Sequence, residues 1–192
     1  MTKALKKLDN LFHDALKDIY FAEKKILSAL PKMAKAAQND DLRAAFEKHQ
    51  AETEQQVKRL DQVFGMIDAK PQGKSCQAIM GMIEEGQEVM EEYKGSPALD
   101  AGLLAAAQSV EHYEISRYGT LIAWAQELGH DNLISLLNAN LREEKAADRK
   151  LNTLAEAKVN RRATGHRTAA VRSSSSSKRS GTVRKKSSRG RR

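Results

Sequence analysis

Acidic side chains interrupt apolar stripes in four segments of this chain. In each segment, apolar residues recur at intervals of three or four, which is the period of a helix with one buried face. The polar residues that fall on these stripes are Glu23, His49, Glu52, Glu111, Glu114, Glu144 and Asp148. A buried, unpaired carboxylate costs on the order of several kcal/mol, so a cluster of them requires protons or cations. The pattern therefore predicts a buried metal site.

The spacing of these acids from the predicted hairpin turns supports one common site. If the first hairpin turns near Asn39, Glu23 lies about 16 residues before the turn and Glu52 about 13 residues after it. Their heights in the bundle then differ by roughly 5 Å. At the second turn, Glu114 and Glu144 are each about 15 residues away and should lie level. The alternative is that a single acid lies on the polar face of its helix, and that the stripe is assigned to the wrong face. For Asp148 taken alone, this interpretation is preferred.

The segments that must position these residues are all predicted to be helical. The chain of 192 residues has three prolines, is rich in helix-forming residues and has no alternating β-branched stretch, so we predict an all-α fold. Pro31 should bend or end the first helix early, and Asn39 should cap the second. The expected helices cover residues 4–38, 40–66, 75–93, 97–128 and 131–159.

These helices form two hairpins joined by a crossover of about 30 residues that contains its own short helix. A simple up-and-down bundle does not need such a crossover. The arrangement matches a ferritin-like four-helix bundle.

Charge divides the chain into two parts. The net charge is +8, but 13 of the 33 Lys and Arg residues lie from Lys158 onward, where no Asp or Glu occurs. The preceding part is therefore acidic, at about −5. We predict a helical bundle over residues 1–159 and a disordered basic tail over residues 160–192, because this tail is too polar to bury a core.

The tail carries positive charge without aromatic residues. Such a segment can bind polyanions by counterion release, and without stacking groups it favours the phosphates of double-stranded DNA. The alternative is a tail that only increases solubility. The candidate DNA-binding residues are Arg161, Arg162, Arg167, Arg172, Lys178, Arg179, Arg184, Lys185 and Lys186.

Several function classes lack sequence support. There is no apolar run near 18 residues and no N-terminal signal region, so the expected location is the cytoplasm, with nucleoid association if the tail binds DNA. The single cysteine, Cys76, suits a reducing compartment and is expected to be a packing residue. No phosphate loop, nucleophile elbow or Cys-x-x-Cys pair is present.

Five motifs resemble the YciE/YciF-type ferritin-like family of bacteria. They are Asp18–Lys24, Leu60–Phe64, Val110–Ile115, Tyr118–Thr120 and Glu143–Asp148. The resemblance extends over residues 5 to about 160. It implies a ferritin-like bundle, a homodimer, a dinuclear metal site and a role in stress response.

The resemblance also implies a set of metal ligands. Glu23, Glu52, Glu111, Glu114, Glu144 and Asp148 would form it, with His49 near the same centre. The wider ferritin-like superfamily usually presents Glu-x-x-His on two helices. This chain has the reverse order, His49-x-x-Glu52, and it has Ala147 rather than a histidine three residues after Glu144.

Carboxylate-rich ligands favour two Fe or Mn ions per subunit, with Fe preferred. Such a centre could act as an oxidoreductase that oxidises ferrous iron or consumes peroxide. The alternative is a non-catalytic structural protein that binds DNA or a partner and holds a static metal. Tyr20 and Tyr113 could tune the centre or could be ordinary residues at the edge of the core. For His112, a position beside the ligands or at an interface is preferred over a role as a ligand.

Overall fold

The structure, a computed structural model, describes residues 5–164, and all regular elements within this range are helices. The prediction of an all-α fold is thereby confirmed. The helices are α1 (Leu8–Ala36), α2 (Asp40–Met66), α3 (Gln77–Glu92), α4 (Leu99–Glu127) and α5 (Asp131–Leu154), followed by the π-helical turn η1 (Ala155–Val159) and the short α6 (Asn160–Ala163).

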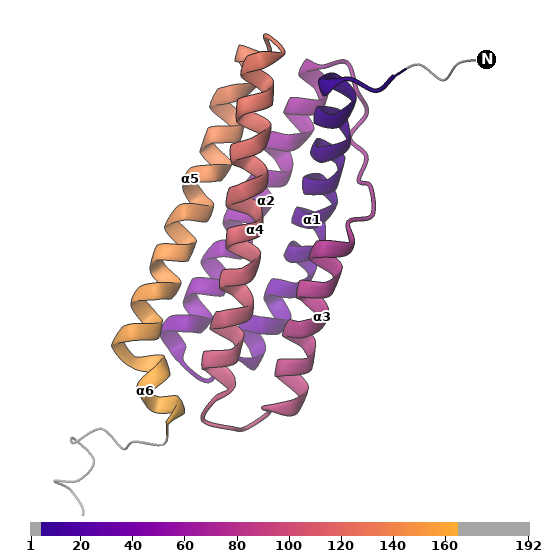
Figure 1. Cartoon of the computed structure of the whole chain (residues 1–192). Helices are drawn as coiled ribbons and strands as arrows, with labels where there is room; N and C mark the ends of the chain where they lie inside the picture. The colour runs from indigo at the N-terminus through magenta and orange to yellow at the C-terminus, as the bar shows by residue number, and fades with distance from the viewer. Residues whose placement is uncertain (1–4, 165–192) are drawn as a thin grey trace, which may run out of the picture.

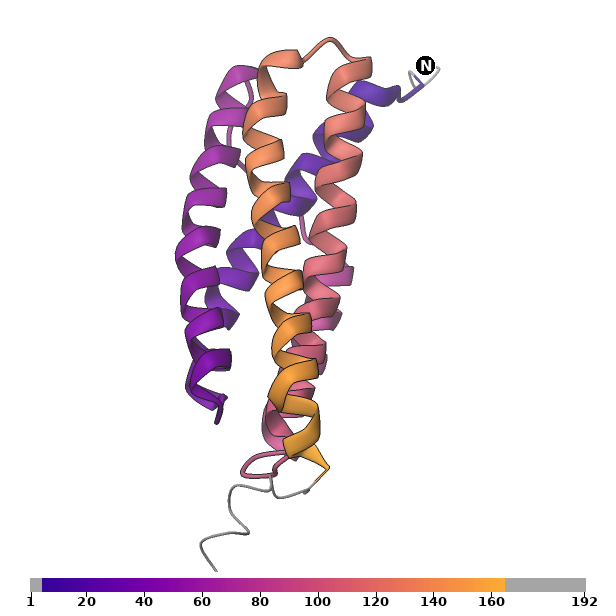
Figure 2. The ribbon, with the colours of Figure 1, turned by 90° about the vertical axis from the view of Figure 1, so that its left-hand side faces the viewer.

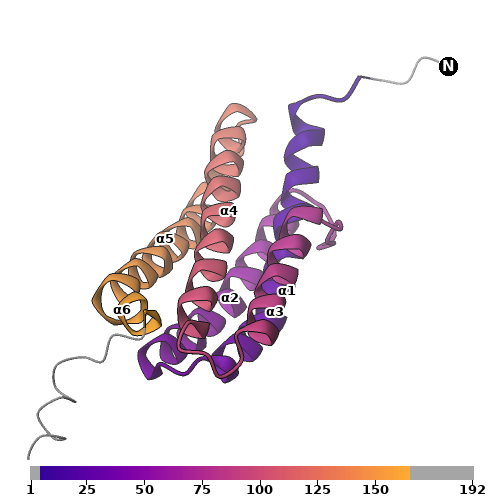
Figure 3. The same cartoon turned by 60° about the horizontal axis from the view of Figure 1, so that its bottom comes forward.

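Four long helices form the bundle, and α3 lies on its outside. The hairpins α1–α2 and α4–α5 pack together through contacts of α2 with α5 and of α1 with α4 (Figure 1). The view in Figure 2 shows α2, α5 and α4 running nearly side by side, with α1 crossing behind them. Helix α3 packs against α1 and α4 (Figure 3). Two hairpins joined by a long crossover with its own helix are the architecture that the sequence predicts.

The first helix differs from the expectation in two respects. It continues through Pro31 to Ala36, so the predicted early end is wrong. Pro31 is exposed, and a proline there only deprives the carbonyl one turn earlier of its helical hydrogen bond. The helix begins at Leu8 and not at the expected residue 4, so Leu5 precedes the helix and is 90% exposed.

Local signals fix the hairpin turns. The Asn39 side chain accepts a hydrogen bond from the backbone N–H of Leu42 at 3.0 Å, which confirms the predicted N-cap. Gly129 has a φ of +73°, a conformation that glycine adopts without strain, and it separates α4 from α5. Both features reverse the chain within a few residues, which places the paired helices antiparallel.

The segment between α2 and α3 is held along α1. The backbone N–H of Lys74 donates to the carbonyl of Lys17 at 3.1 Å. Gly73 lies so close to Phe21 that a Cβ atom there would stand 3.0 Å from the Phe21 Cβ. The buried Cys76 then contacts the Tyr113 hydroxyl at 3.1 Å. These contacts place α3 over the groove between α1 and α4.

The last helical segment extends beyond the expected end near residue 159. Through η1 and α6 the chain stays helical to Ala163, and Arg161 and Arg162 are exposed on α6. Lys158 forms an ion pair with Asp41 at 2.7 Å, which holds this end against the start of α2. The other predicted DNA-binding residues lie outside the described residues, namely Arg167, Arg172, Lys178, Arg179, Arg184, Lys185 and Lys186.

Among the described helices, none combines the length and the apolar character that crossing a membrane would require.

Candidate metal centre

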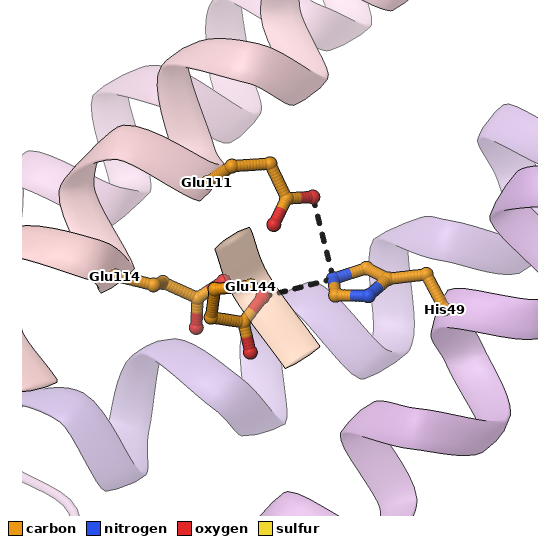
Figure 4. Close-up of side chains that lie close together, drawn as sticks. All are labelled: His49, Glu111, Glu114 and Glu144. Carbon is orange, nitrogen blue, oxygen red and sulfur yellow. Dashed lines mark ion pairs between the residues drawn. The ribbon is translucent and has the colours of Figure 1, made fainter. Parts of the chain in front are cut away.

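Four side chains from three helices converge inside the bundle. His49 comes from α2, Glu111 and Glu114 from α4, and Glu144 from α5. One potential ligand atom from each lies within 4.8 Å of all the others. Figure 4 shows their polar ends directed toward one another. This is the separation at which one or more cations could be held between them.

The imidazole of His49 lies close to two carboxylates. Its Nε2 atom is 3.4 Å from Glu111 Oε1 and 3.6 Å from Glu144 Oε2 (Figure 4). The Glu144 side chain is fully buried and the Glu111 side chain is only 4% exposed. Water therefore does not reach these groups freely, and their charges are not screened by solvent.

Unpartnered polar atoms gather at this point. In the described part of the chain, eight buried side-chain atoms have no hydrogen-bond partner. They are Glu23 Oε2, Nδ1 and Nε2 of His49, Gln56 Oε1, Glu111 Oε2, both carboxylate oxygens of Glu114, and Glu144 Oε2. Each such atom costs on the order of 1–3 kcal/mol unless something satisfies it. These are hard oxygen and imidazole donors, so the residues present fit a bound metal.

A chain of hydrogen bonds connects Glu23 to the surface. The fully buried Tyr118 hydroxyl donates to Glu23, and Asn140 Nδ2 donates to the Tyr118 oxygen at 2.9 Å. Asn140 Oδ1 accepts a hydrogen bond from Arg59 at 2.9 Å, and Arg59 forms a bidentate ion pair with Glu143 at 2.7 and 2.8 Å. This chain fixes one oxygen of Glu23 and leaves the other unpartnered, facing the cluster.

Glu144 is positioned in a similar way. The amide nitrogen of Gln56, fully buried on α2, donates to Glu144 Oε1, which leaves Oε2 beside His49. Tyr118 therefore hydrogen-bonds the carboxylate of Glu23, and Gln56 hydrogen-bonds that of Glu144. Each satisfies one oxygen and leaves the second oxygen available as a ligand.

Burial shifts the ionisation of the whole cluster. It raises the pKa of Glu23 and of Glu111 to about 8, and charged neighbours add to its effect. Burial, together with the surrounding carboxylates, raises the pKa of Glu114 well above its usual range, and burial does the same for Glu144. Burial works to lower the pKa of His49, but the carboxylates around it outweigh this effect and raise that pKa. The metal-free cluster therefore retains protons that a cation would displace.

Two of the predicted ligands lie at the rim. Glu52 pairs with Lys48, and its Oε2 atom is 3.8 Å from His49 Nδ1. The nearby imidazole of His49, and then Lys48, lower the pKa of the Glu52 carboxyl. Asp148 Oδ1 is 3.3 Å from the Nε2 atom of the largely exposed His112. The structure thus brings Glu23 beside the four-residue cluster and leaves Glu52 and Asp148 around it.

A polar pocket reaches the cluster between α2 and α5. Its volume is about 450 Å³, and His49 and Glu111 form part of its wall. Charged residues also line it, namely Asp41, Lys48, Glu52 and Lys150. This opening gives hydrated ions a path from solvent to the cluster.

Residues 7–164 match a protein family described as a domain of unknown function, DUF892. The chain belongs to this family. It is 44% identical to the YciF protein of Escherichia coli strain K12 over 160 residues, which are 83% of this chain and 96% of that protein.

Two solved structures share the bundle of this DUF892 member. The crystal structure of the E. coli stress protein YciF matches with a TM-score of 0.77 at 44% identity, over 81% of this chain and 99% of that one. YcfI of Rhodopseudomonas palustris, provisionally described as a structural protein, matches with a TM-score of 0.75 at 50% identity, over 80% of this chain and 98% of that one. The expected family and ferritin-like fold are thereby confirmed.

Sequence reasoning missed two residues that support the centre of this DUF892 protein. Asn140 is fully buried on α5, whereas the neighbouring Leu141 is only partly buried. The signal was present, because Leu137, Asn140 and Glu144 follow the same spacing of three and four. Arg59 gave no comparable signal, since its partners lie more than 80 residues away.

The two tyrosines for which the sequence left open a tuning role or a place at the edge of the core, Tyr20 and Tyr113, have partners away from the centre. The Tyr20 hydroxyl donates to Asp61 at 2.8 Å, and the Tyr113 hydroxyl contacts Cys76. Burial and the hydrogen bond to Asp61 raise the pKa of Tyr20 to about 12. Among these aromatic residues, Tyr118 is the one that hydrogen-bonds a carboxylate beside the cluster.

The raised pKa values predict how the stability of metal-free protein depends on pH. Glutamates titrate near 4.3 in an unfolded chain, whereas Glu23 and Glu111 titrate at about 8 in the fold. Their stabilising contribution is complete below the unfolded pKa and is lost as pH rises toward 8. Urea unfolding of chelator-treated protein should therefore give a free energy that falls from pH 5 to pH 8, by up to about 1.4 kcal/mol per pH unit for each group. Glu111→Gln should flatten the curve and the exposed Glu54→Gln should not; a level wild-type curve would contradict this assignment.

Removal of the Tyr118 hydroxyl should destabilise the fold measurably. Tyr118→Phe leaves Glu23 Oε1 and Asn140 Nδ2 buried without this partner, at a cost of about 1–3 kcal/mol. Tyr20→Phe is the matched control, since Asp61 is only partly buried and water can replace the lost bond, at about 0.5–1.5 kcal/mol. Chemical denaturation of metal-free protein at pH 7 would measure the loss of unfolding free energy in both variants. Equal losses in the two variants would argue against a special role for Tyr118.

Proposed function

We propose that this protein is a dinuclear metal-binding redox protein of the stress response, with iron as the preferred metal. The observation that carries the proposal is the convergence of unpartnered, buried carboxylate and imidazole atoms inside the bundle. These polar atoms gain nothing from burial in an apolar core, and they are not exposed to water that could hydrogen-bond to them. Cation binding gives each of them a partner.

Charge balance supports two ions in preference to one. Four buried carboxylates lie at or beside the centre, from Glu23, Glu111, Glu114 and Glu144. Once their protons are displaced they carry four negative charges, which two divalent cations neutralise. A single divalent ion would leave two buried negative charges, and uncompensated charge in a core is strongly unfavourable.

The donor types narrow the choice of metal. The site offers carboxylate oxygens and one imidazole and has no thiolate, because Cys76 contacts Tyr113 outside the cluster. Hard oxygen ligands suit iron and manganese better than copper or zinc. When bound, a pair of such ions supplies two-electron redox chemistry toward dioxygen or peroxide.

The protein's own residues have distinct roles in this proposal. Glu111, Glu114, Glu144 and His49 hold the ions, while Tyr118 and Gln56 orient the carboxylates of Glu23 and Glu144. Glu52, at the rim beside Lys48, draws cations into the polar pocket. Asp148, a ligand by family resemblance, would join the site from its place beside Gln108 and His112.

The relatives support a stress role and also suggest an alternative. The relative from E. coli is a stress protein, and consumption of ferrous iron or peroxide would protect a stressed cell. The provisional description of YcfI as structural favours a second candidate, a static metal that only stabilises the bundle.

A cytoplasmic location and a homodimer are further parts of the proposal.

Metal analysis separates these possibilities. Protein purified without added metal or chelator should contain about two Fe or Mn ions per chain by mass spectrometry, as the family resemblance implies. Glu23→Ala combined with Glu144→Ala should lose them, while the exposed Glu54→Ala should retain them. Fe²⁺ oxidation and peroxide consumption are then assayed on the loaded protein. Retained metal without turnover would favour the static alternative, and a folded wild-type protein without metal would overturn the site.

We also propose that the basic tail binds double-stranded DNA. Its support is charge alone, since 13 basic residues and no acidic residue follow from Lys158. Ending the chain at Thr164 should abolish duplex binding in a gel-shift or anisotropy assay and leave the metal content unchanged. Binding by the full chain should weaken steeply with salt and ignore sequence, because phosphate contacts release counterions. Equal affinity of the two chains would contradict the proposal.

A further inference from the structure

A second pocket reaches the centre from the side opposite the polar opening. It lies between α1, α3 and α4, has a volume of about 40 Å³, and shares His49 and Glu111 with the polar pocket. Lys32 and Gln87, which are exposed, also line it, so the pocket extends from the surface to the cluster. The two pockets therefore meet at the same two ligand candidates.

The lining of this second pocket is almost entirely apolar. Between its surface end and the cluster, the wall consists of aliphatic and thioether side chains and one glycine. The residues that matter here are Ile26, Leu30, Met33, Met82, Gly86 and Met90. A hydrated ion passing along this wall would lose its water without gaining a ligand in exchange. The free-energy cost of this desolvation excludes ions from the apolar pocket. A small apolar molecule loses nothing there and gains dispersion contacts with the polarisable sulfur atoms.

We propose that this pocket binds dioxygen and conducts it to the metal centre. The inference rests on the proposed function, because it assigns the oxidant that the centre would use. The volume limits the occupant: one water needs about 10–15 Å³, so a pocket of about 40 Å³ suits a diatomic molecule or a single xenon atom. Helix α3 packs against both α1 and α4 and forms one wall of the pocket.

The two openings would then separate the reactants by polarity. Metal ions, which carry coordinated water, and peroxide, which hydrogen-bonds to water, enter through the charged pocket between α2 and α5. Dioxygen, which is apolar, enters between α1, α3 and α4. Both routes end at His49 and Glu111, so blocking the apolar pocket should impair the reaction with dioxygen and spare the reaction with peroxide.

Two glycines of α3 allow a matched test. Gly86 is buried in the pocket wall, and a Cβ atom there would lie 3.8 Å from the Ala106 Cβ, an ordinary contact. Gly86→Leu therefore directs a side chain into the pocket. Gly81 is exposed on the same helix and a Cβ there meets nothing within 4 Å, so Gly81→Leu is the control.

Xenon is the probe for the pocket, used on the full chain after chelator treatment. Crystals under xenon pressure should show one xenon atom between α1, α3 and α4 in the wild type and in Gly81→Leu, and none in Gly86→Leu. Circular dichroism checks that each variant folds. If Gly86→Leu does not fold, Gly86→Ala, which suits a helix better than glycine, should reduce the xenon occupancy. Absence of xenon from the wild-type pocket, or full occupancy in a folded Gly86→Leu, would overturn the inference.

A second measurement addresses the oxidant. In metal-loaded protein, Gly86→Leu should raise severalfold the dioxygen concentration that gives the half-maximal rate, with unchanged metal content and unchanged rate with peroxide. An unchanged dioxygen dependence would overturn the route. If the wild type binds xenon but no metal, the proposed function fails while the apolar pocket stands, so the two failures are distinguishable.

Discussion

The structure depends on how a helical bundle tolerates carboxylates in its core. Glu23, Glu114 and Glu144 are fully buried and Glu111 nearly so, in a core otherwise rich in leucine and phenylalanine. Hydrogen bonds satisfy only part of their oxygen atoms, and each carboxylate keeps at least one oxygen without a partner. Protons make this arrangement tolerable, and cations would make it favourable. The pKa shifts, the partners of each carboxylate and the polar pocket all follow from this requirement.

Much of this could be predicted from the sequence, because helical periodicity fixes which residues share a face. Glu23 stands alone in an apolar stripe, and Glu111 and Glu114 lie three residues apart on another, so their burial follows once the helices form. The Asn39 cap and the turn at Gly129 fixed the pairing of the helices as well. Fold class, crossover and the inner carboxylates thus follow from local rules.

What the sequence could not supply is the exact rotation of each helix and the pairing of distant side chains. On α5 a small difference in phase buries Asn140 and leaves Asp148 partly exposed beside His112. Glu52 faces the rim because its pairing with Lys48 on the outside competes with the interior. Pro31 shows the reverse case, in which the helix continues past a residue that often ends one, at the loss of a single backbone hydrogen bond on an exposed face. Such outcomes depend on neighbours far away in the sequence.

The separation of the site residues along the chain has a consequence for folding. Each hairpin forms from residues close in sequence, but Tyr118 and Glu23 are 95 residues apart, and Gln56 and Glu144 are 88 apart. Long-range contacts of this kind form late, because chain closure must precede them. Neither hairpin alone contains the full donor set. The complete donor set is therefore assembled only at the last stage of folding, and an incompletely folded chain offers no complete site for a metal ion.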